Sequence, residues 1–174
     1  MLEFDPCFPF AHSHAQVSKE GEAHEVSIDV AKMSQLVSET IEGDEDEDSD
    51  EVKDIPLPNV TAVVLKKVIE YCNHYREEAM SPIQTPLKSA KLDDLVQAWY
   101  VEFVKVSKDM LFDLVAAANF MDIKPLLDLT CLAVSILIKG KSAGELRDMF
   151  NISADFTPEE EEQAKRENEW VEKG

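Results

Sequence analysis

The chain is poor in glycine, in cysteine and in basic residues, and each shortage argues against a class of function. Only 5 of the 174 residues are glycine, which leaves almost nothing for a loop that cradles phosphate groups. Lys and Arg number 17 against 36 Asp and Glu, and this formal charge of −19 argues against nucleic acid as a partner. The 3 cysteines lie far apart, so the sequence encodes neither a disulfide framework nor a structural zinc site.

Long apolar runs are missing as well. The richest stretch, 126–138, contains Asp128 and Thr130 and does not approach the length of a membrane span. The N-terminal segment carries acids where a secretory signal needs bases. We therefore expect a protein of a reducing compartment, with no membrane partner.

Acidic residues, by contrast, are abundant and concentrated in two segments. Residues 42–51 hold 8 acids and no base, and residues 155–174 hold 8 acids against 3 bases. Such runs are typical of solvated segments, and we expect 42–54 to be a disordered loop. A second interpretation, in which 42–51 binds basic proteins as an acidic chaperone does, stays open.

The first half of the chain shows short apolar patterns. Residues 1–13 have no readable period and are expected to form a loose N-terminal head. Residues 26–30 alternate apolar and polar, which predicts a half-buried strand, and a short helix is expected from Ala31. Residues 55–60 contain two prolines and predict an edge strand.

Helical spacing dominates the remainder of the first two thirds. A helix is expected from about Thr61, followed by a variable loop over 77–95. Ser107 is a good N-cap for the next helix, and Asp122 is expected to cap the helix after it. That helix, through Ile138, is apolar nearly all round, so we expect it to be central to the fold, with Cys131 as an inert core thiol.

The last third carries clear helix-start signals. Ser142 with Glu145, and Thr157 with Glu160, match the capping box, in which the side chain and backbone of two residues bond reciprocally. The helix opened at Thr157 is almost entirely polar before Trp170 and cannot be held by an apolar face of its own.

Residues that could carry chemistry lack the spacing that chemistry requires. The run 138–142, IKGKS, resembles the tail of a phosphate-binding loop, but its upstream glycine is missing, so we interpret Gly140 as a helix stop. Cys7, His12 and His14 lack a fourth metal ligand at a useful spacing. We therefore expect no catalytic site, no metal and no cofactor.

Apolar residues near the C-terminus are the strongest functional candidates. Phe150, Ile152 and Phe156 lie in the turns before the polar helix that carries Trp170. They could pack as ordinary core, or they could form an apolar ledge that a partner's helices complete, because aromatic anchors dominate interface energetics. Both interpretations can hold at once.

Eight segments along the chain form a recognisable series: PLPNV at 56–60, LKKVIEYC at 65–72, AAANFMDIK at 116–124, LLDLTC at 126–131, IKGK at 138–141, FNI at 150–152, DFTPEEEE at 155–162 and ENEW at 167–170. Taken in this order, they resemble one family, the S-phase kinase-associated (Skp-one) adaptors of the SCF ubiquitin ligases. The resemblance covers about residues 20–172. The family's first strand falls at 14–18, where the apolar alternation is weak.

The resemblance implies an α/β fold: a BTB/POZ domain, a small sheet with packed helices, at 14–122, and a C-terminal helical F-box-binding extension at 123–174. It assigns cullin binding to Asn119 and Phe120, where the family usually has Tyr at the second position. That change removes one hydroxyl hydrogen bond, worth about 1 kcal/mol. F-box binding is assigned to Ile123, Leu127, Cys131, Ile138, Leu146, Phe150, Ile152, Phe156 and Trp170.

The function implied is that of a non-catalytic adaptor that bridges a cullin scaffold to F-box substrate receptors for protein ubiquitination. Its partners would be F-box proteins and the cullin, and its location the cytoplasm and nucleus. The alternative function is the acidic chaperone acting through 42–51. Whether the free protein also forms a weak homodimer through an uncovered aromatic surface stays open.

Overall fold

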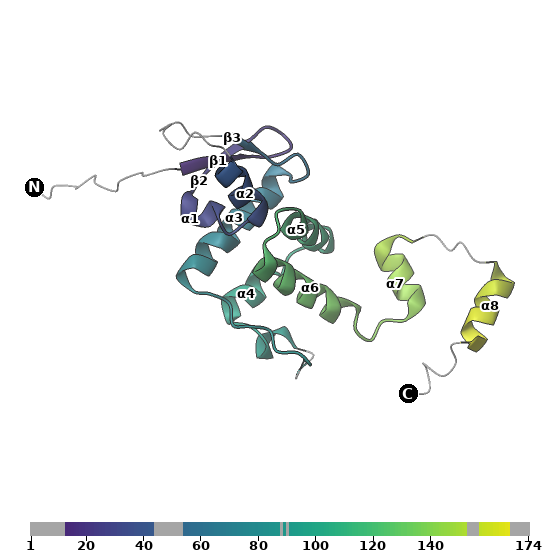
Figure 1. Ribbon diagram of the computed structural model, residues 1–174. Coiled ribbons are helices and arrows are strands. Elements are labelled where there is room, and N and C mark those ends of the chain that lie inside the picture. The colour runs from purple at the N-terminus through teal and green to yellow at the C-terminus, as the bar shows by residue number, and fades with distance from the viewer. Residues whose placement is uncertain (1–12, 44–53, 88, 90, 153–156, 168–174) are drawn as a thin grey trace, which may run out of the picture. The chain divides into compact units, whose positions relative to one another are not determined.

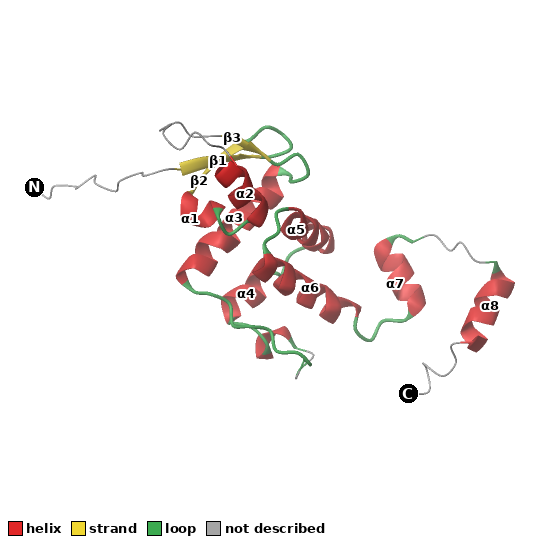
Figure 2. Ribbon diagram, in the orientation of Figure 1, coloured by secondary structure: helices red, strands yellow, loops and turns green. Residues whose placement is uncertain are grey.

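Strands occur only near the start of the described chain, and helices make up most of the rest (Figure 2). The computed structural model describes residues 13–43, 54–87, 89, 91–152 and 157–167. The chain divides into two compact units, 1–137 and 138–174. The predicted head at 1–13, apart from Ser13, and most of the predicted acidic loop at 42–54 lie outside the described residues.

A sheet of three strands opens the first unit (Figure 1). Strand β1 (Ser13–Val17) lies in the middle, antiparallel to β2 (Ala23–Ser27) and parallel to β3 (Asp54–Pro56). The weak pattern at 14–18 is therefore the central strand. Its alternation is obscured because two polar residues, Gln16 and Ser18, are buried at 3% and 4% exposure alongside Ala15.

The strand predicted over 26–30 is shorter than expected. β2 ends at Ser27, and α1 (Ile28–Ala31) begins at the next residue. Val30 and its neighbour Ala31 are both buried, a pattern that an alternating strand facing solvent on one side cannot produce. The helix expected from Ala31 begins later as well, with α2 (Gln35–Gly43), after a turn around Ser34.

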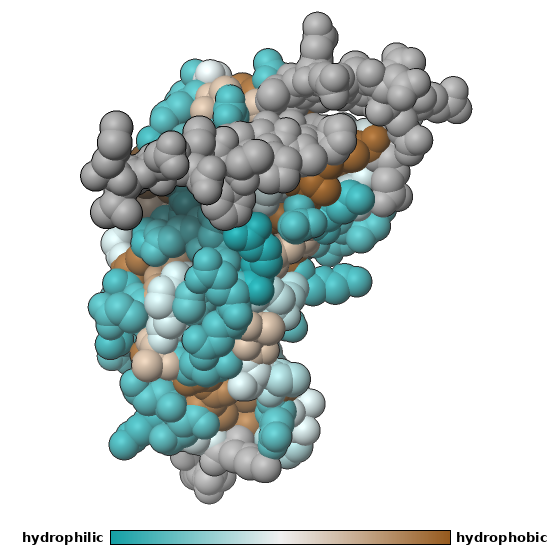
Figure 3. All heavy atoms as spheres, turned by 90° about the vertical axis from the view of Figure 1, so that its left-hand side faces the viewer, coloured by the Kyte–Doolittle hydropathy of each residue, from teal (hydrophilic) through white to brown (hydrophobic). Residues whose placement is uncertain are grey.

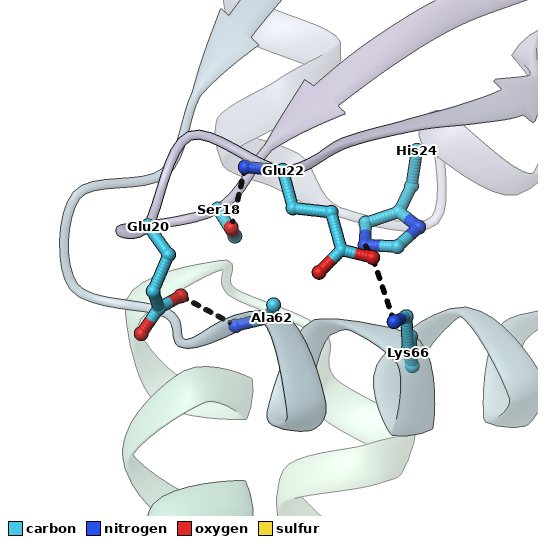
Figure 4. Close-up of polar contacts among 6 residues, drawn as sticks. All are labelled: Ser18, Glu20, Glu22, His24, Ala62 and Lys66. Atoms are coloured by element: carbon cyan, nitrogen blue, oxygen red, sulfur yellow. Dashed lines mark hydrogen bonds and ion pairs between the residues drawn. The ribbon is translucent and has the colours of Figure 1, made fainter.

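Two carboxylates tie the β1–β2 turn to the start of α3 (Ala62–Glu77), as Figure 4 shows. The N-cap residue of α3, Thr61, makes no side-chain cap hydrogen bond. Glu20 supplies one from outside the helix: its Oε2 accepts from the Ala62 backbone N–H at 2.8 Å. Glu22 pairs with Lys66 at 2.6 Å, and this hydrogen bond holds the pKa of the Glu22 carboxyl below its usual range. α3 thus begins next to the predicted residue, Thr61, but the hydrogen bond that caps it comes from the β1–β2 turn.

The core of the first unit lies between the sheet and helices α3, α4 (Ala98–Phe103), α5 (Lys108–Phe120) and α6 (Lys124–Ile138). The 3₁₀ turn η1 (Leu92–Asp94) ends the loop that follows α3, within the predicted variable region 77–95. Aromatic rings join α3 to α4: Tyr71 lies 5.7 Å from Tyr100 and 5.5 Å from Phe103, between ring centroids. His74 stacks on Trp99 at 3.8 Å.

Two buried tyrosines in this cluster differ in one respect, and the difference is testable. The Tyr100 hydroxyl donates to the Glu78 carbonyl at 2.5 Å, whereas the Tyr71 hydroxyl has no hydrogen-bond partner among the described residues. Tyr100→Phe should lower the free energy of unfolding by about 1 kcal/mol. Tyr71→Phe should leave it unchanged or raise it, because it removes a buried polar group that has no partner. Urea denaturation of both variants measures the contrast, and equal losses would contradict it.

Of the two caps predicted for α5 and α6, the structure has one. Ser107 caps α5 as expected, since its Oγ accepts from the Met110 N–H at 3.3 Å. Asp122, however, does not cap α6: it adopts a left-handed φ of 48° and its N–H donates to the Asn119 carbonyl at 3.2 Å. It ends α5 instead, because aspartate tolerates this conformation better than most residues do. α6 then begins at Lys124, with Pro125 in its first turn.

The second unit holds α7 (Ala143–Phe150) and α8 (Pro158–Glu167). Gly140 follows α6 with a φ of 77°, which confirms it as a helix stop.

The face in Figure 3 is mostly hydrophilic where its residues are described. Among the described helices, none has both the length and the apolar character to cross a membrane.

Candidate functional site

The first candidate surface is the last turn of α5. Asn119 is exposed and Phe120 is half-buried, with its ring packed against the core. Their neighbours Ala117 and Ala118 are buried, so the last turn of α5 exposes Asn119 and leaves the Phe120 ring partly uncovered. The pair offers an amide that can both donate and accept, next to a partly covered aromatic ring.

The second candidate surface is the side of α6 that faces away from the core. Leu126, Leu129 and Leu132 are buried on one side of the helix. Leu127 and Cys131, at positions i and i+4, fall on the opposite side, where Leu127 is half-buried and Cys131 is exposed. Sequence reasoning missed a further residue on this side: Val134, at i+7, is half-buried. Its helical spacing from Leu127 was the signal that could have identified it.

Ile138, the last residue of α6, is half-buried and shares this spacing, at i+11 from Leu127. We call Leu127, Cys131, Val134 and Ile138 the outer face of α6. These residues are apolar or weakly polar, and the core does not bury them fully. Such a face is typical of a surface that another protein covers.

One expectation for α6 needs correction. Cys131 is not a core thiol: it is exposed, because the helical period carries it away from Leu129 and Leu132. Of the two cysteines that the structure describes, Cys72 is the buried one, and burial raises its pKa to about 12. Ile123, predicted to bind F-box proteins, precedes α6 and is 1% exposed.

The family resemblance predicts a domain boundary between residues 122 and 123, whereas the compact units of the structure divide at a different residue. α6 is buried into the first unit along Leu126, Leu129 and Leu132, so the compact division comes after Leu137.

α7 carries Leu146, Met149 and Phe150, and Ile152 lies just beyond its end. Its capping box is present in full: Ser142 Oγ accepts from the Glu145 N–H at 3.3 Å, and Glu145 accepts from the Ser142 N–H at 2.8 Å. Asn151, with φ of 57°, ends the helix. Phe150 is 39% exposed and Ile152 is 57% exposed. Large apolar side chains so exposed favour the interface interpretation of the ledge.

Leu146 is half-buried on α7, one helical turn before Phe150. The second predicted capping box, at Thr157 and Glu160, is also present and opens α8. Phe156 and Trp170, the remaining predicted F-box-binding residues, lie outside the described residues.

The two capping boxes predict how helicity depends on pH. The backbone hydrogen bonds from Ser142 and Thr157 hold the pKa of Glu145 and of Glu160 below their ordinary value of 4.5. A carboxyl with a lowered pKa in the folded state stabilises that state above its unfolded pKa, and the contribution disappears as pH falls through the folded pKa. The helical signal of α7 and α8 should therefore decline below about pH 4.5.

A glutamine double variant isolates this effect from the other acids. Glu145→Gln with Glu160→Gln keeps an acceptor in each box but removes the titrating charge. Far-ultraviolet circular dichroism should show less helix in the variant than in the parent at pH 7, with the two converging at pH 3. A gap that stays constant across this range would contradict the assignment.

A metal site in the described part of the chain would require a cluster of ligating side chains. No group of three or more His, Cys, Asp or Glu there could hold a metal ion. Cys7, His12 and the run at 44–53 lie outside the described residues.

Two family models match this chain, and the ranges that they match begin or end at helices and strands of the structure. A model of the Skp1 family tetramerisation domain matches residues 16–77, which begin in β1 and end with α3. A model of the Skp1 family dimerisation domain matches residues 124–171, which begin at the first residue of α6. The chain belongs to the Skp1 family.

Relatives within the Skp1 family match nearly the whole chain. SKP1-like protein 1A of Arabidopsis thaliana is 46% identical over 154 residues, covering 88% of this chain and 93% of the relative. A Skp1-related protein of Caenorhabditis elegans is 44% identical over 157 residues, 89% of each chain. The S-phase kinase-associated protein 1 homolog of Tetrahymena thermophila is 43% identical over 157 residues, with 90% and 92% covered. The Skp1-family POZ fold, a small sheet with packed helices, is therefore confirmed.

Proposed function

We propose that this chain bridges a cullin scaffold to F-box substrate receptors, as the adaptor of an SCF ubiquitin ligase. Membership in the Skp1 family supports an SCF adaptor role in general, and with it F-box proteins and cullins as the kind of partner. The family consists of adaptors rather than enzymes, so the work of the chain is binding. We assign cullin binding to Asn119 and Phe120, and F-box binding to the outer face of α6 with Leu146, Phe150, Ile152, Phe156 and Trp170.

The observation that carries the proposal is the outer face of α6. A helix whose one side is fully buried in the core keeps Leu127, Cys131 and Val134 only partly covered on its other side. Asn119 and Phe120 are outward on a different helix, α5. A chain with two separate partly apolar surfaces can hold two partners at once, which is what an adaptor must do.

Reconstitution from purified parts tests the proposal. The chain, a cullin and an F-box protein should elute together from a size-exclusion column, with light scattering giving the mass of one copy of each. Competition between the two partners, so that only binary complexes form, would contradict a bridging role.

Removing the acidic run separates the adaptor from the acidic chaperone. A variant lacking 42–51 should retain both partners, because neither assigned surface includes that run. Loss of F-box and cullin binding together with loss of affinity for histones would favour the chaperone. Retention of both partners would support the adaptor.

We further propose the cytoplasm and nucleus as its location. Both cysteines that the structure describes, Cys72 and Cys131, are free thiols, which fits a reducing compartment. Fractionation of cells that express the tagged chain tests this, and recovery in a secretory fraction would contradict it.

A further inference from the structure

Ser34 joins the start of α2 to the end of α5 through a single buried hydroxyl. The residue is 1% exposed. Its Oγ accepts from the Val37 N–H at 3.2 Å, which satisfies an N–H in the first turn of α2. The same hydroxyl donates to the Met121 carbonyl at 2.5 Å, across 87 residues of sequence. The hydroxyl thus donates one hydrogen bond and accepts another within the core.

The backbone beside Ser34 makes a second link to the same turn. The Gln35 N–H donates to the Asp122 carbonyl at 3.4 Å. Met121 and Asp122 directly follow Phe120, and Asp122 has the left-handed φ of 48° that most residues avoid. Such a conformation persists only where the surrounding structure holds it.

We propose that Ser34 is a positioning residue for the cullin-facing pair, Asn119 and Phe120. Ser34 does not contact the cullin: it fixes the turn that follows Phe120 and thereby the orientation of the last turn of α5. A protein-binding surface requires its contact residues to be held within about 0.5 Å by supporting hydrogen bonds and packing. The inference rests on the proposed cullin role of Asn119 and Phe120.

Ser34→Ala tests the role against a matched serine on α5. The full chain carrying Ser34→Ala should bind a cullin about tenfold more weakly, with F-box affinity within about twofold of the parent. Ser107→Ala is the control: it removes the N-cap hydrogen bond at the opposite end of α5 and should leave both affinities within about twofold. Ser34→Thr retains the hydroxyl and should keep cullin affinity within about threefold. Isothermal titration calorimetry of the parent and the three variants with each partner gives these affinities.

Equal cullin affinities for Ser34→Ala and Ser107→Ala would overturn the inference, as would a Ser34→Ala variant that loses F-box affinity to the same degree. Hydrogen exchange in the free chain gives a readout that needs no cullin. In Ser34→Ala, the amides of Asp122 and Ile123 should exchange at least fivefold faster, whereas Ser107→Ala should leave them unchanged. Unchanged exchange in both would overturn the inference even if cullin affinity fell.

The same measurements distinguish failure of the proposed function. If replacement of Asn119 and Phe120 by alanine leaves cullin affinity unchanged, the assignment of the surface is wrong. If that replacement abolishes cullin binding while Ser34→Ala has no effect, the surface is right and the positioning role of Ser34 is wrong.

Discussion

Replacing Asn119 and Phe120 together by alanine should weaken cullin binding by about a hundredfold and leave F-box binding intact. Asn119 is exposed and Phe120 is half-buried, so the variant loses an amide and an aromatic anchor from one surface. Truncating an interface anchor costs more than about 1 kcal/mol of binding free energy, and two losses of about 1.4 kcal/mol, each a factor of ten, give the expected hundredfold. Calorimetric titration with a cullin and with an F-box protein measures both affinities.

Controls for this variant come from the same chain. Asn73 is an exposed asparagine on α3, and Asn73→Ala should leave both affinities unchanged. Phe120→Tyr restores the hydroxyl that the family usually carries, and cullin affinity should then rise by about fivefold, from a hydrogen bond worth about 1 kcal/mol. Loss of both partners in the alanine variant, or of neither, would contradict a chain with two independent surfaces.

Trp170→Ala should reduce F-box capture by at least about a hundredfold while leaving cullin affinity unchanged. The residue lies outside the described part of the chain, so the expectation comes from sequence. The sequence from Pro158 onward is predominantly acidic, and Trp170 is the largest apolar residue in it. A tryptophan anchor that becomes buried in a partner contributes more than its neighbours do. Pull-down with an F-box protein and with a cullin measures both effects.

Ile152→Asp extends this test to a described residue. Ile152 is 57% exposed, so a charge there should not disturb the core, but it should weaken F-box binding by about tenfold. Val63→Asp is the matched control, because Val63 is a similarly exposed apolar residue, at 61%, and is not among the residues assigned to either partner. F-box affinities that are equal in the two aspartate variants would contradict the assignment of Ile152.

Local signals predicted the helix starts well. Ser107, Ser142 and Thr157 were each identified as helix starts from one residue and its spacing to the next, and the structure places helices directly after all three. Capping is a contact between residues three apart, so the chain need not be folded for its pattern to be readable. Gly140 ended α6 for a similarly local reason.

Local sequence patterns did not predict contacts between residues that lie far apart in the sequence. Glu20 caps α3 in place of Thr61, and no pattern within the helix indicates a carboxylate from 42 residues earlier. The central position of β1 was hidden because Gln16 and Ser18 are buried without apolar alternation. The role of Ser34 was likewise hidden, since its second hydrogen bond spans 87 residues.

The scarcity of basic residues and glycine argues against phosphate-binding functions, and local sequence patterns are enough to indicate the family, the helix starts and the candidate binding residues. Which side of each helix stays uncovered depends on how the folded chain packs. α6 is apolar nearly all round, so its sequence does not distinguish Cys131 from Leu129. Packing against the core buries Leu129 and Ile123 and leaves Cys131 exposed. The reason is physical: burial is a property of contacts between distant segments, which a local pattern does not contain.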